Sequence, residues 1–259
     1  MLVFPAVSAV ATFLVAACFV LPMIGLGGFD QLDKVANGEA GLGTYLWAFA
    51  FYFAQYSVIF FFNAALVGAA MIRLEGGDPT VGDGFRIAFG RIGPILGYAA
   101  IAATVGVILR MIQERAGFIG KWIVGLLGVA WTVATFMVVP ILVTRDVGPL
   151  QAVKDSATML KQTWGENVIG QGGIGLVFGL IHGVLIVAGI ALFVAAAMTQ
   201  SVALMTVSGL GVVGVIILVA LIQAALSGIY SAALFRHASG ESAGTSFNPQ
   251  LLQNAFAPK

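Results

Sequence analysis

The feature that most constrains this chain is a long interval without charge. No Asp, Glu, Lys or Arg occurs between Glu166 and Arg236. Over the whole chain only 9% of residues are charged and 60% are hydrophobic, whereas soluble domains carry about 25% charged residues. A water-soluble fold would lack the polar surface needed to cover itself, but a bilayer accepts about 20 apolar residues per helical span. The composition therefore predicts an all-α integral membrane protein.

Six apolar stretches are expected to cross the membrane within a single membrane domain, residues 1–259. They lie at about residues 2–26, 44–72, 94–112, 120–143, 168–198 and 204–235. The charge-free interval is long enough for two long spans or, just, three. A turn near residues 198–201, or one near residues 208–211, would divide it into two.

Two segments between spans, residues 79–92 and 149–164, are predicted to be amphipathic helices lying in the membrane interface. Asp78 is a candidate N-cap for the first, and Pro149 suits the first turn of the second. Apolar residues recur every three or four positions in both segments: Val81, Phe85, Ala88 and Ile92, then Leu150, Val153, Ala157, Leu160 and Trp164.

These segments indicate an internal repeat. Each follows an even-numbered span that ends in an arginine, and the tail at residues 247–256 resembles the first of them after the last span ends at Arg236. The pattern predicts three helical hairpins, each followed by an amphipathic helix. A parallel repeat needs an even number of spans per unit, so two spans are expected after Glu166.

The distribution of basic residues predicts the orientation. Eight lie on the face that holds the amphipathic helices and four on the other, which places the first face and both termini in the cytoplasm. The first set is Arg73, Arg86, Arg91, Arg145, Lys154, Lys161, Arg236 and Lys259; the second is Lys34, Arg110, Arg115 and Lys121.

Three stretches carry a family resemblance: LVFPAVSAVATFLV near the start, GPLQAVKDSATMLKQTWG in the middle, and ALFRHASGE followed by FNPQLLQNAF at the end. They resemble an uncharacterised family of prokaryotic multi-pass membrane proteins, a domain of unknown function, over essentially the whole chain. The pattern PLxAxxxSxxL at residues 149–160 also resembles repeat-built membrane domains attached to glycerophosphodiester phosphodiesterases. The resemblance implies the cytoplasmic (inner) membrane of a prokaryote.

The interiors of the predicted spans hold no ionisable carboxylate, lysine or arginine, which disfavours proton-coupled transport. The candidate polar positions are Asn63, His182 and Gln223. We interpret His182 as a neutral histidine bonded to a neighbouring helix, with a ligand or proton-carrier role as the alternative. Asn63 and Gln223 are expected to form hydrogen bonds between helices, as is Gln55, which shares a helical face with Asn63.

Small residues spaced by four suggest how the last two spans meet. Gly175, Gly179 and Gly183 form one smooth face, and Ala224 and Gly228 belong to a second one. Such faces let helix backbones approach closely, so we expect contact between these two spans, with a homo-oligomer contact as the alternative.

No catalytic, nucleotide-binding or metal-ligand motif is present, and no basic run suggests nucleic acid. We therefore expect a protein without enzymatic activity or cofactor that organises or binds lipids or partner proteins. The expected partners are the lipid bilayer and a lipid, another membrane protein or a second copy of the chain. The alternative is a transporter or channel for an uncharged or amphiphilic solute, which a continuous cavity lined by Asn63, His182 or Gln223 would favour. A membrane enzyme is the third hypothesis, and it would need cytoplasmic carboxylates converging on one pocket.

Overall fold

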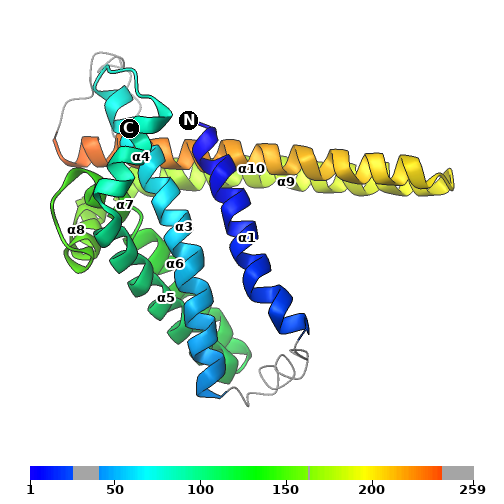
Figure 1. Cartoon of the computed structure of the whole chain (residues 1–259), viewed down its shortest axis with the longest axis horizontal. Coiled ribbons are helices and arrows are strands. Elements are labelled where there is room, and N and C mark those ends of the chain that lie inside the picture. The colour runs from blue at the N-terminus through cyan, green and yellow to red at the C-terminus, as the bar shows by residue number, and fades with distance from the viewer. Residues whose placement is uncertain (26–40, 163, 241–259) are drawn as a thin grey trace.

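The computed structural model describes residues 1–25, 41–162 and 164–240, and within these ranges every regular element is an α-helix (Figure 1). The helices are α1 (Val3–Gly25), α3 (Leu42–Leu74), α4 (Val81–Gly90), α5 (Ile92–Arg115), α6 (Phe118–Ala134), α7 (Val138–Thr144), α8 (Pro149–Gln162), α9 (Trp164–Met198) and α10 (Val202–Ala238). The tail helix predicted at residues 247–256 lies outside the described residues.

Six segments are long and apolar enough to cross a membrane, which confirms the predicted number of candidate spans. They are Val3–Pro22, Leu42–Leu74, Ile92–Arg115, Phe118–Thr144, Gly170–Met198 and Val202–Ala238. The charge-free interval contains two helices, and the first of its two predicted turn positions is the one found. Gln200 in that turn has a φ of 54°, in the left-handed region that polar turn residues tolerate better than apolar ones.

The fourth span was predicted as one helix over residues 120–143, but it is broken between α6 and α7. Pro140 explains the break, because a proline ring clashes with the carbonyl four residues earlier and supplies no N–H. Ser156 of α8 bonds to both broken ends: its Oγ accepts from the Met137 N–H at 3.1 Å and donates to the Ala134 carbonyl at 2.7 Å.

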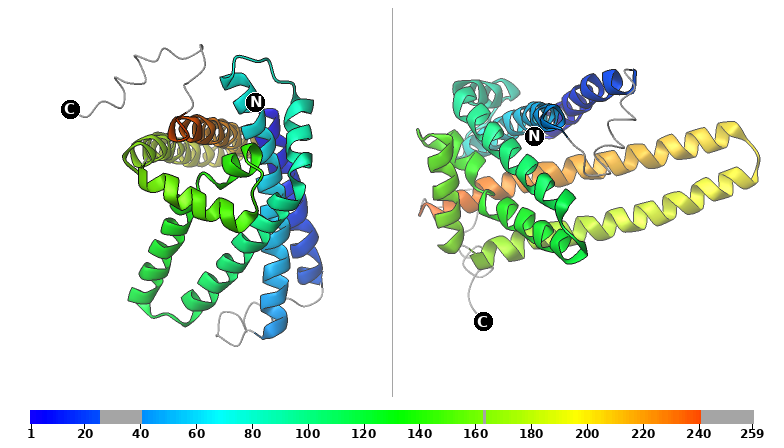
Figure 2. Two further views of the ribbon diagram at one scale, coloured as in Figure 1. Left: turned by 90° about the vertical axis from the view of Figure 1, so that its left-hand side faces the viewer. Right: turned by 90° about the horizontal axis from the view of Figure 1, so that it is seen from below.

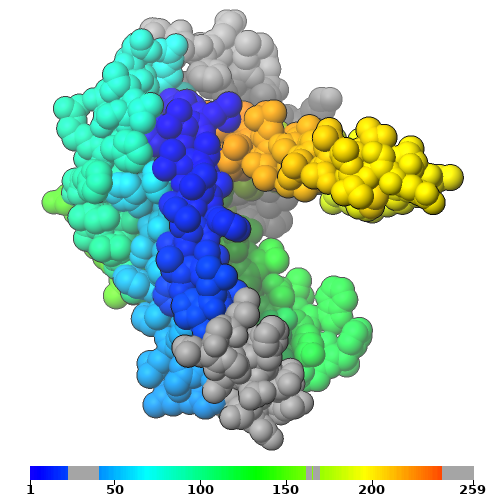
Figure 3. All heavy atoms as spheres, turned by 45° about the vertical axis from the view of Figure 1, so that its right-hand side comes forward, coloured from blue at the N-terminus to red at the C-terminus, as the bar shows by residue number. Residues whose placement is uncertain are grey.

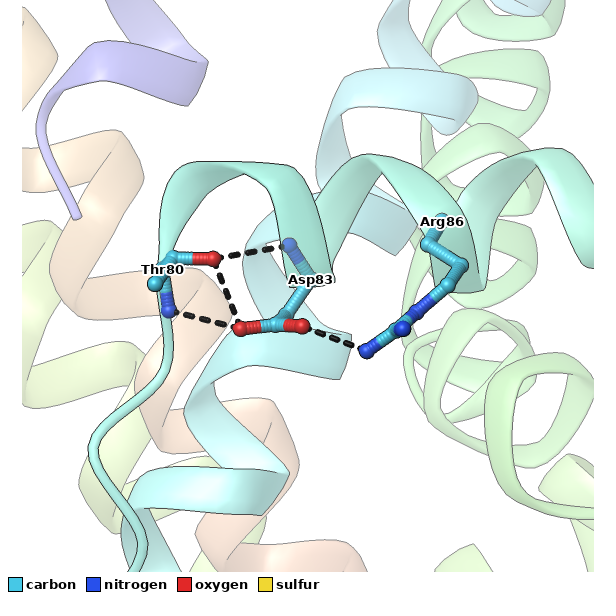
Figure 4. A network of polar contacts seen from close by, with 3 residues as sticks. All are labelled: Thr80, Asp83 and Arg86. Atoms are coloured by element: carbon cyan, nitrogen blue, oxygen red, sulfur yellow. Dashed lines mark hydrogen bonds and ion pairs between the residues drawn. The ribbon is translucent and has the colours of Figure 1, made fainter.

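Helices occur at both predicted amphipathic segments, but their caps and buried faces differ in detail. Thr80, not Asp78, caps α4, through reciprocal bonds with Asp83, which also pairs with Arg86 (Figure 4). Asp78 instead pairs with Arg73 at 2.7 Å, which holds it away from the helix start.

On α8 the buried line is Ala152, Ser156 and Met159. Leu150 of the predicted stripe is 66% exposed. The small side chains of Ala152 and Ser156 let α8 approach the broken span closely. The larger apolar residues of the predicted stripe therefore lie beside this contact. The described part of this helix reaches Gln162, and residue 163 lies outside the described residues.

The core lies at the end of the molecule that holds α4, α7 and α8 (Figure 1). It joins the second half of α3 to the start of α1, all of α7 and the last turns of α10. Glycines bring α3 and α4 together: a Cβ on Gly84 would lie 2.6 Å from the Ala65 carbonyl oxygen, and one on Gly68 would lie 2.9 Å from Ile87.

The hairpin of α9 and α10 crosses the other helices and projects to one side (Figures 1 and 2). The two helices have 35 and 37 residues, or about 52 and 55 Å at 1.5 Å per residue. Only the end of α10 packs into the core. We call residues 172–222 the arm; most of its side chains are apolar and most are exposed. Figure 3 shows it leaving the bundle beside α1, above a hollowed face.

Candidate functional site

A cavity of about 240 Å³ lies where α10 crosses α1 and α3, at the root of the arm. Four polar side chains line it, Ser8 from α1, Asn63 from α3, and Ser227 and Ser231 from α10. We call it the polar cavity. Its remaining wall is apolar: Pro5, Ile59, Phe62, Leu66, Phe136, Ala224 and Gly228. Ile59 is 37% exposed and Ala224 is exposed as well, so the wall reaches the surface of the bundle.

Asn63 is the polar group of this cavity with the most unused hydrogen-bonding capacity. Ser231 donates to the Gly228 carbonyl at 2.8 Å, and Ser227 accepts from Gln171 at 3.4 Å. Among the described residues the Asn63 amide has no hydrogen-bond partner. An asparagine side chain offers two donors and one acceptor oxygen, so a molecule in the cavity would find both kinds of group.

Among the residues that the structure describes, none with a charged side chain lines the polar cavity. The nearest arginine along α3 is Arg73, ten residues or about 15 Å beyond Asn63. Along α10 it is Arg236, five residues or about 7.5 Å beyond Ser231. Recognition in this cavity therefore depends on neutral hydrogen bonds and apolar contact.

A second cavity of about 460 Å³ lies between α3, α5 and α6. Its wall is mostly apolar, with Tyr56, Thr132 and Trp131 as its side chains that carry a polar group. The break in the fourth span adjoins both cavities, because Trp131 and Thr132 line this one and Phe136 lines the polar cavity.

A family model of unknown function, DUF6159, matches residues 42–245, which include α3 to α10. The chain belongs to the DUF6159 family. The match covers Asn63, Ser227 and Ser231 of the polar cavity, whereas Ser8 lies before it. No curated protein and no solved structure matches the chain.

In this DUF6159 member the three predicted polar positions do not converge. Asn63 lines the polar cavity, but neither His182 nor Gln223 does. The Nδ1 atom of His182 lies 2.7 Å from the carbonyl of Phe178 in its own helix, so this bond does not join two helices. Gln223 is half-buried on α10 next to Ala224. Gln55 does form the expected type of bond, from its Nε2 to the Thr12 carbonyl of α1 at 3.3 Å.

The predicted glycine face is not where α9 meets α10. A Cβ added to Gly175, Gly179 or Gly183 would meet nothing within 4 Å. Gly228 instead packs on α3, where a Cβ would lie 2.5 Å from Leu66 and 3.3 Å from the Asn63 oxygen. Ala224 is exposed at the polar cavity.

The two helices approach each other at different glycines. Gly170 lies against Tyr230, and Gly189 lies against Val212. Both α9 and α10 are apolar all round, so spacing by four does not determine which small-residue face is the contact. A homo-oligomer contact through Gly175, Gly179 and Gly183 stays a prediction.

Four described carboxylates on the side of α4 and α8 form ion pairs, and none of them lines either cavity. The pairs are Asp78 with Arg73, Asp83 with Arg86, Asp146 with Arg91, and Asp155 with Arg145. Within residues 1–25, 41–162 and 164–240, no group of three His, Cys, Asp or Glu is placed to hold a metal ion.

Sequence reasoning missed the serines of the polar cavity. Ser227 and Ser231 are four residues apart on either side of Gly228, so the sequence alone could have predicted that they share one helical face. Ser8 and Phe136 had no such signal, because their approach depends on how α1, α7 and α10 cross α3.

Proposed function

We propose that this protein is a non-enzymatic membrane protein that binds a lipid, with the polar end of the lipid in the polar cavity. The observation that carries the proposal is the Asn63 amide, which faces an uncharged cavity without a hydrogen-bond partner among the described residues. The Asn63 side chain is half-buried and opens into the cavity, so a polar group bound there could form hydrogen bonds with its amide. Exposed Ile59 and Ala224 give the wall an apolar edge that a lipid chain can follow.

We also propose that the protein lies in the inner membrane of a prokaryote with both termini in the cytoplasm. The start of α1, the end of α10, α4 and α8 lie toward the same end of the molecule (Figure 1). This is the end to which the excess of basic residues belongs, and such an excess favours the cytoplasmic face.

The test is native mass spectrometry of the full chain, released gently from its own membrane. We expect a lipid at fixed stoichiometry on the wild type and on Gln223→Leu. We expect its loss in Asn63→Leu, which keeps the side-chain volume but removes the amide. Equal retention by Asn63→Leu would refute binding at this cavity. A chain that carries only a protein partner would favour organisation of proteins instead.

The second candidate function is transport of an uncharged or amphiphilic solute. The observation that favours it is the break between α6 and α7, since transporters often bind substrates at interrupted helices between cavities. Vesicles that contain the purified protein would then move a fluorescent lipid analogue between leaflets faster than protein-free vesicles. Equal rates in both would remove this candidate and leave static binding.

A further inference from the structure

We infer that the ligand of the polar cavity is an uncharged lipid whose head carries a free hydroxyl, a diacylglycerol or a long-chain alcohol. This inference rests on the proposed lipid-binding function and goes further by naming the chemical class. Three properties of the cavity support it: its hydrogen-bonding groups, its lack of charge and its size.

The hydrogen-bonding groups suit a hydroxyl. A hydroxyl both donates and accepts, and Asn63 offers an acceptor oxygen and an amide donor within one side chain. Ser8 and Ser227 add two more hydroxyls to the same wall. Ser227 itself accepts a hydrogen bond from the Nε2 atom of Gln171 at 3.4 Å. The cavity therefore offers both donors and acceptors, and a ligand hydroxyl can pair with both through one group.

The absence of charged lining residues disfavours a phosphate or a carboxylate. Burying an ionised group without a counter-ion costs far more than burying a neutral group that forms hydrogen bonds. Within residues 1–25, 41–162 and 164–240, no lysine or arginine lines the polar cavity, and no aspartate or glutamate is there for a cationic head group. A phospholipid head would have to stay outside the cavity, nearer the level of Arg73, and would leave the Asn63 amide unpaired.

The size of the cavity fits the head of such a lipid but not its chains. A volume of about 240 Å³ corresponds to about eight water-sized groups at about 30 Å³ each. A glycerol unit with its first ester atoms fills such a space. The chains must then leave past exposed Ala224, and the arm offers them an apolar surface. Ile217 and Val213, seven and eleven residues before Ala224, share its face of α10, and both are exposed.

The experiment measures lipid binding to the purified full chain by native mass spectrometry in a non-lipid detergent. The probes are dioleoylglycerol, its O-methyl ether, oleyl alcohol and dioleoyl phosphatidic acid. The variants are Ala224→Phe, which places a ring at the mouth of the cavity, and Leu226→Phe, on the opposite face of α10. Both residues are exposed, but Leu226 lines neither the cavity nor the face that carries Ile217 and Val213, so the second variant controls for an added ring.

We expect dioleoylglycerol to bind the wild type and Leu226→Phe alike. We expect about a tenfold or greater loss with Ala224→Phe, and a similar loss for the methyl ether on the wild type. Binding of oleyl alcohol in place of dioleoylglycerol would identify a long-chain alcohol as the source of the hydroxyl.

Two other outcomes separate the inference from the proposed function. If phosphatidic acid or the methyl ether binds as well as dioleoylglycerol, and Ala224→Phe removes both, the hydroxyl assignment is wrong but the cavity still binds lipid. If Ala224→Phe changes the binding of none of the probes, the proposed function itself fails, and this inference fails with it.

Discussion

Replacing Ser156 with alanine tests how the fourth span is held at its break. Ser156 is only 1% exposed, and its hydroxyl bonds the Met137 N–H and the Ala134 carbonyl at once. The substitution changes little in volume, so the lost hydrogen bonds dominate its effect. The Met137 N–H and the Ala134 carbonyl have no helical partner to replace Ser156, because both lie where the helix is interrupted.

The magnitude follows from the burial of the two backbone groups. Met137 is fully buried, so its N–H should incur the full penalty for a buried group without a partner, about 1–3 kcal/mol. Ala134 is half-buried, and its carbonyl should lose less because water or a relaxed neighbour can reach it. Together we expect Ser156→Ala to lower the free energy of unfolding by about 2–4 kcal/mol.

The assay is unfolding in mixed micelles with a rising fraction of sodium dodecyl sulfate, followed by tryptophan fluorescence and circular dichroism. Thr158→Ala is the control, since Thr158 is an exposed residue of α8 whose hydroxyl bonds only to the Lys154 carbonyl of its own helix. We expect it to stay within about 0.5 kcal/mol of the wild type. If Ser156→Ala also stayed within that margin, the serine would not be what satisfies the break.

Two further predictions concern α4. The pKa of Asp83 is lowered, chiefly by the hydrogen bond that the Thr80 hydroxyl donates, and also by that of the Thr80 N–H. Its stabilising contribution should therefore be present above the ordinary carboxyl pKa and vanish as the pH falls below it. The melting temperatures of wild type and Asp83→Asn should differ at pH 7 and converge in acid; a constant difference would contradict this. Gly84→Ala places a methyl group 2.6 Å from the Ala65 carbonyl and should destabilise by about 1–3 kcal/mol, whereas Gly90→Ala meets nothing and should not; equal melting temperatures would contradict close packing.

The spans were predictable because membrane crossing depends on length and hydropathy alone, and both can be read from the sequence. The charge-free interval predicted the last two helices but left two positions for their turn, of which residues 198–201 proved to be the one. The helix over Pro149–Gln162 was predictable for a related reason, since its polar and apolar positions alternate at a helical period. The break after Ala134 had a readable signal in Pro140, which the continuous-span prediction overlooked.

The contacts between spans were not predictable to the same extent. In a soluble helix the polar face shows which side is buried, but α9 and α10 have no polar face. Gly179 and Gly189 are equally small and equally apolar in context, yet only Gly189 contacts the neighbouring helix. The same holds for the polar cavity. Asn63 could be identified as a polar residue within a span, but the sequence did not predict that α10 crosses α3 there and encloses it.

The break in the fourth candidate span links α8 to the polar cavity. Ser156 ties α8 to both ends of the break, and Phe136 within the break lines the polar cavity. A shift of α8 would therefore move Phe136 relative to Asn63, because Ser156 of α8 bonds the N–H of Met137, the residue that follows Phe136. We propose that Leu150, exposed on the same helix, contacts the bilayer. A bilayer surface that holds α8 and a lipid that enters the cavity would then act on one structural element, the three residues between α6 and α7.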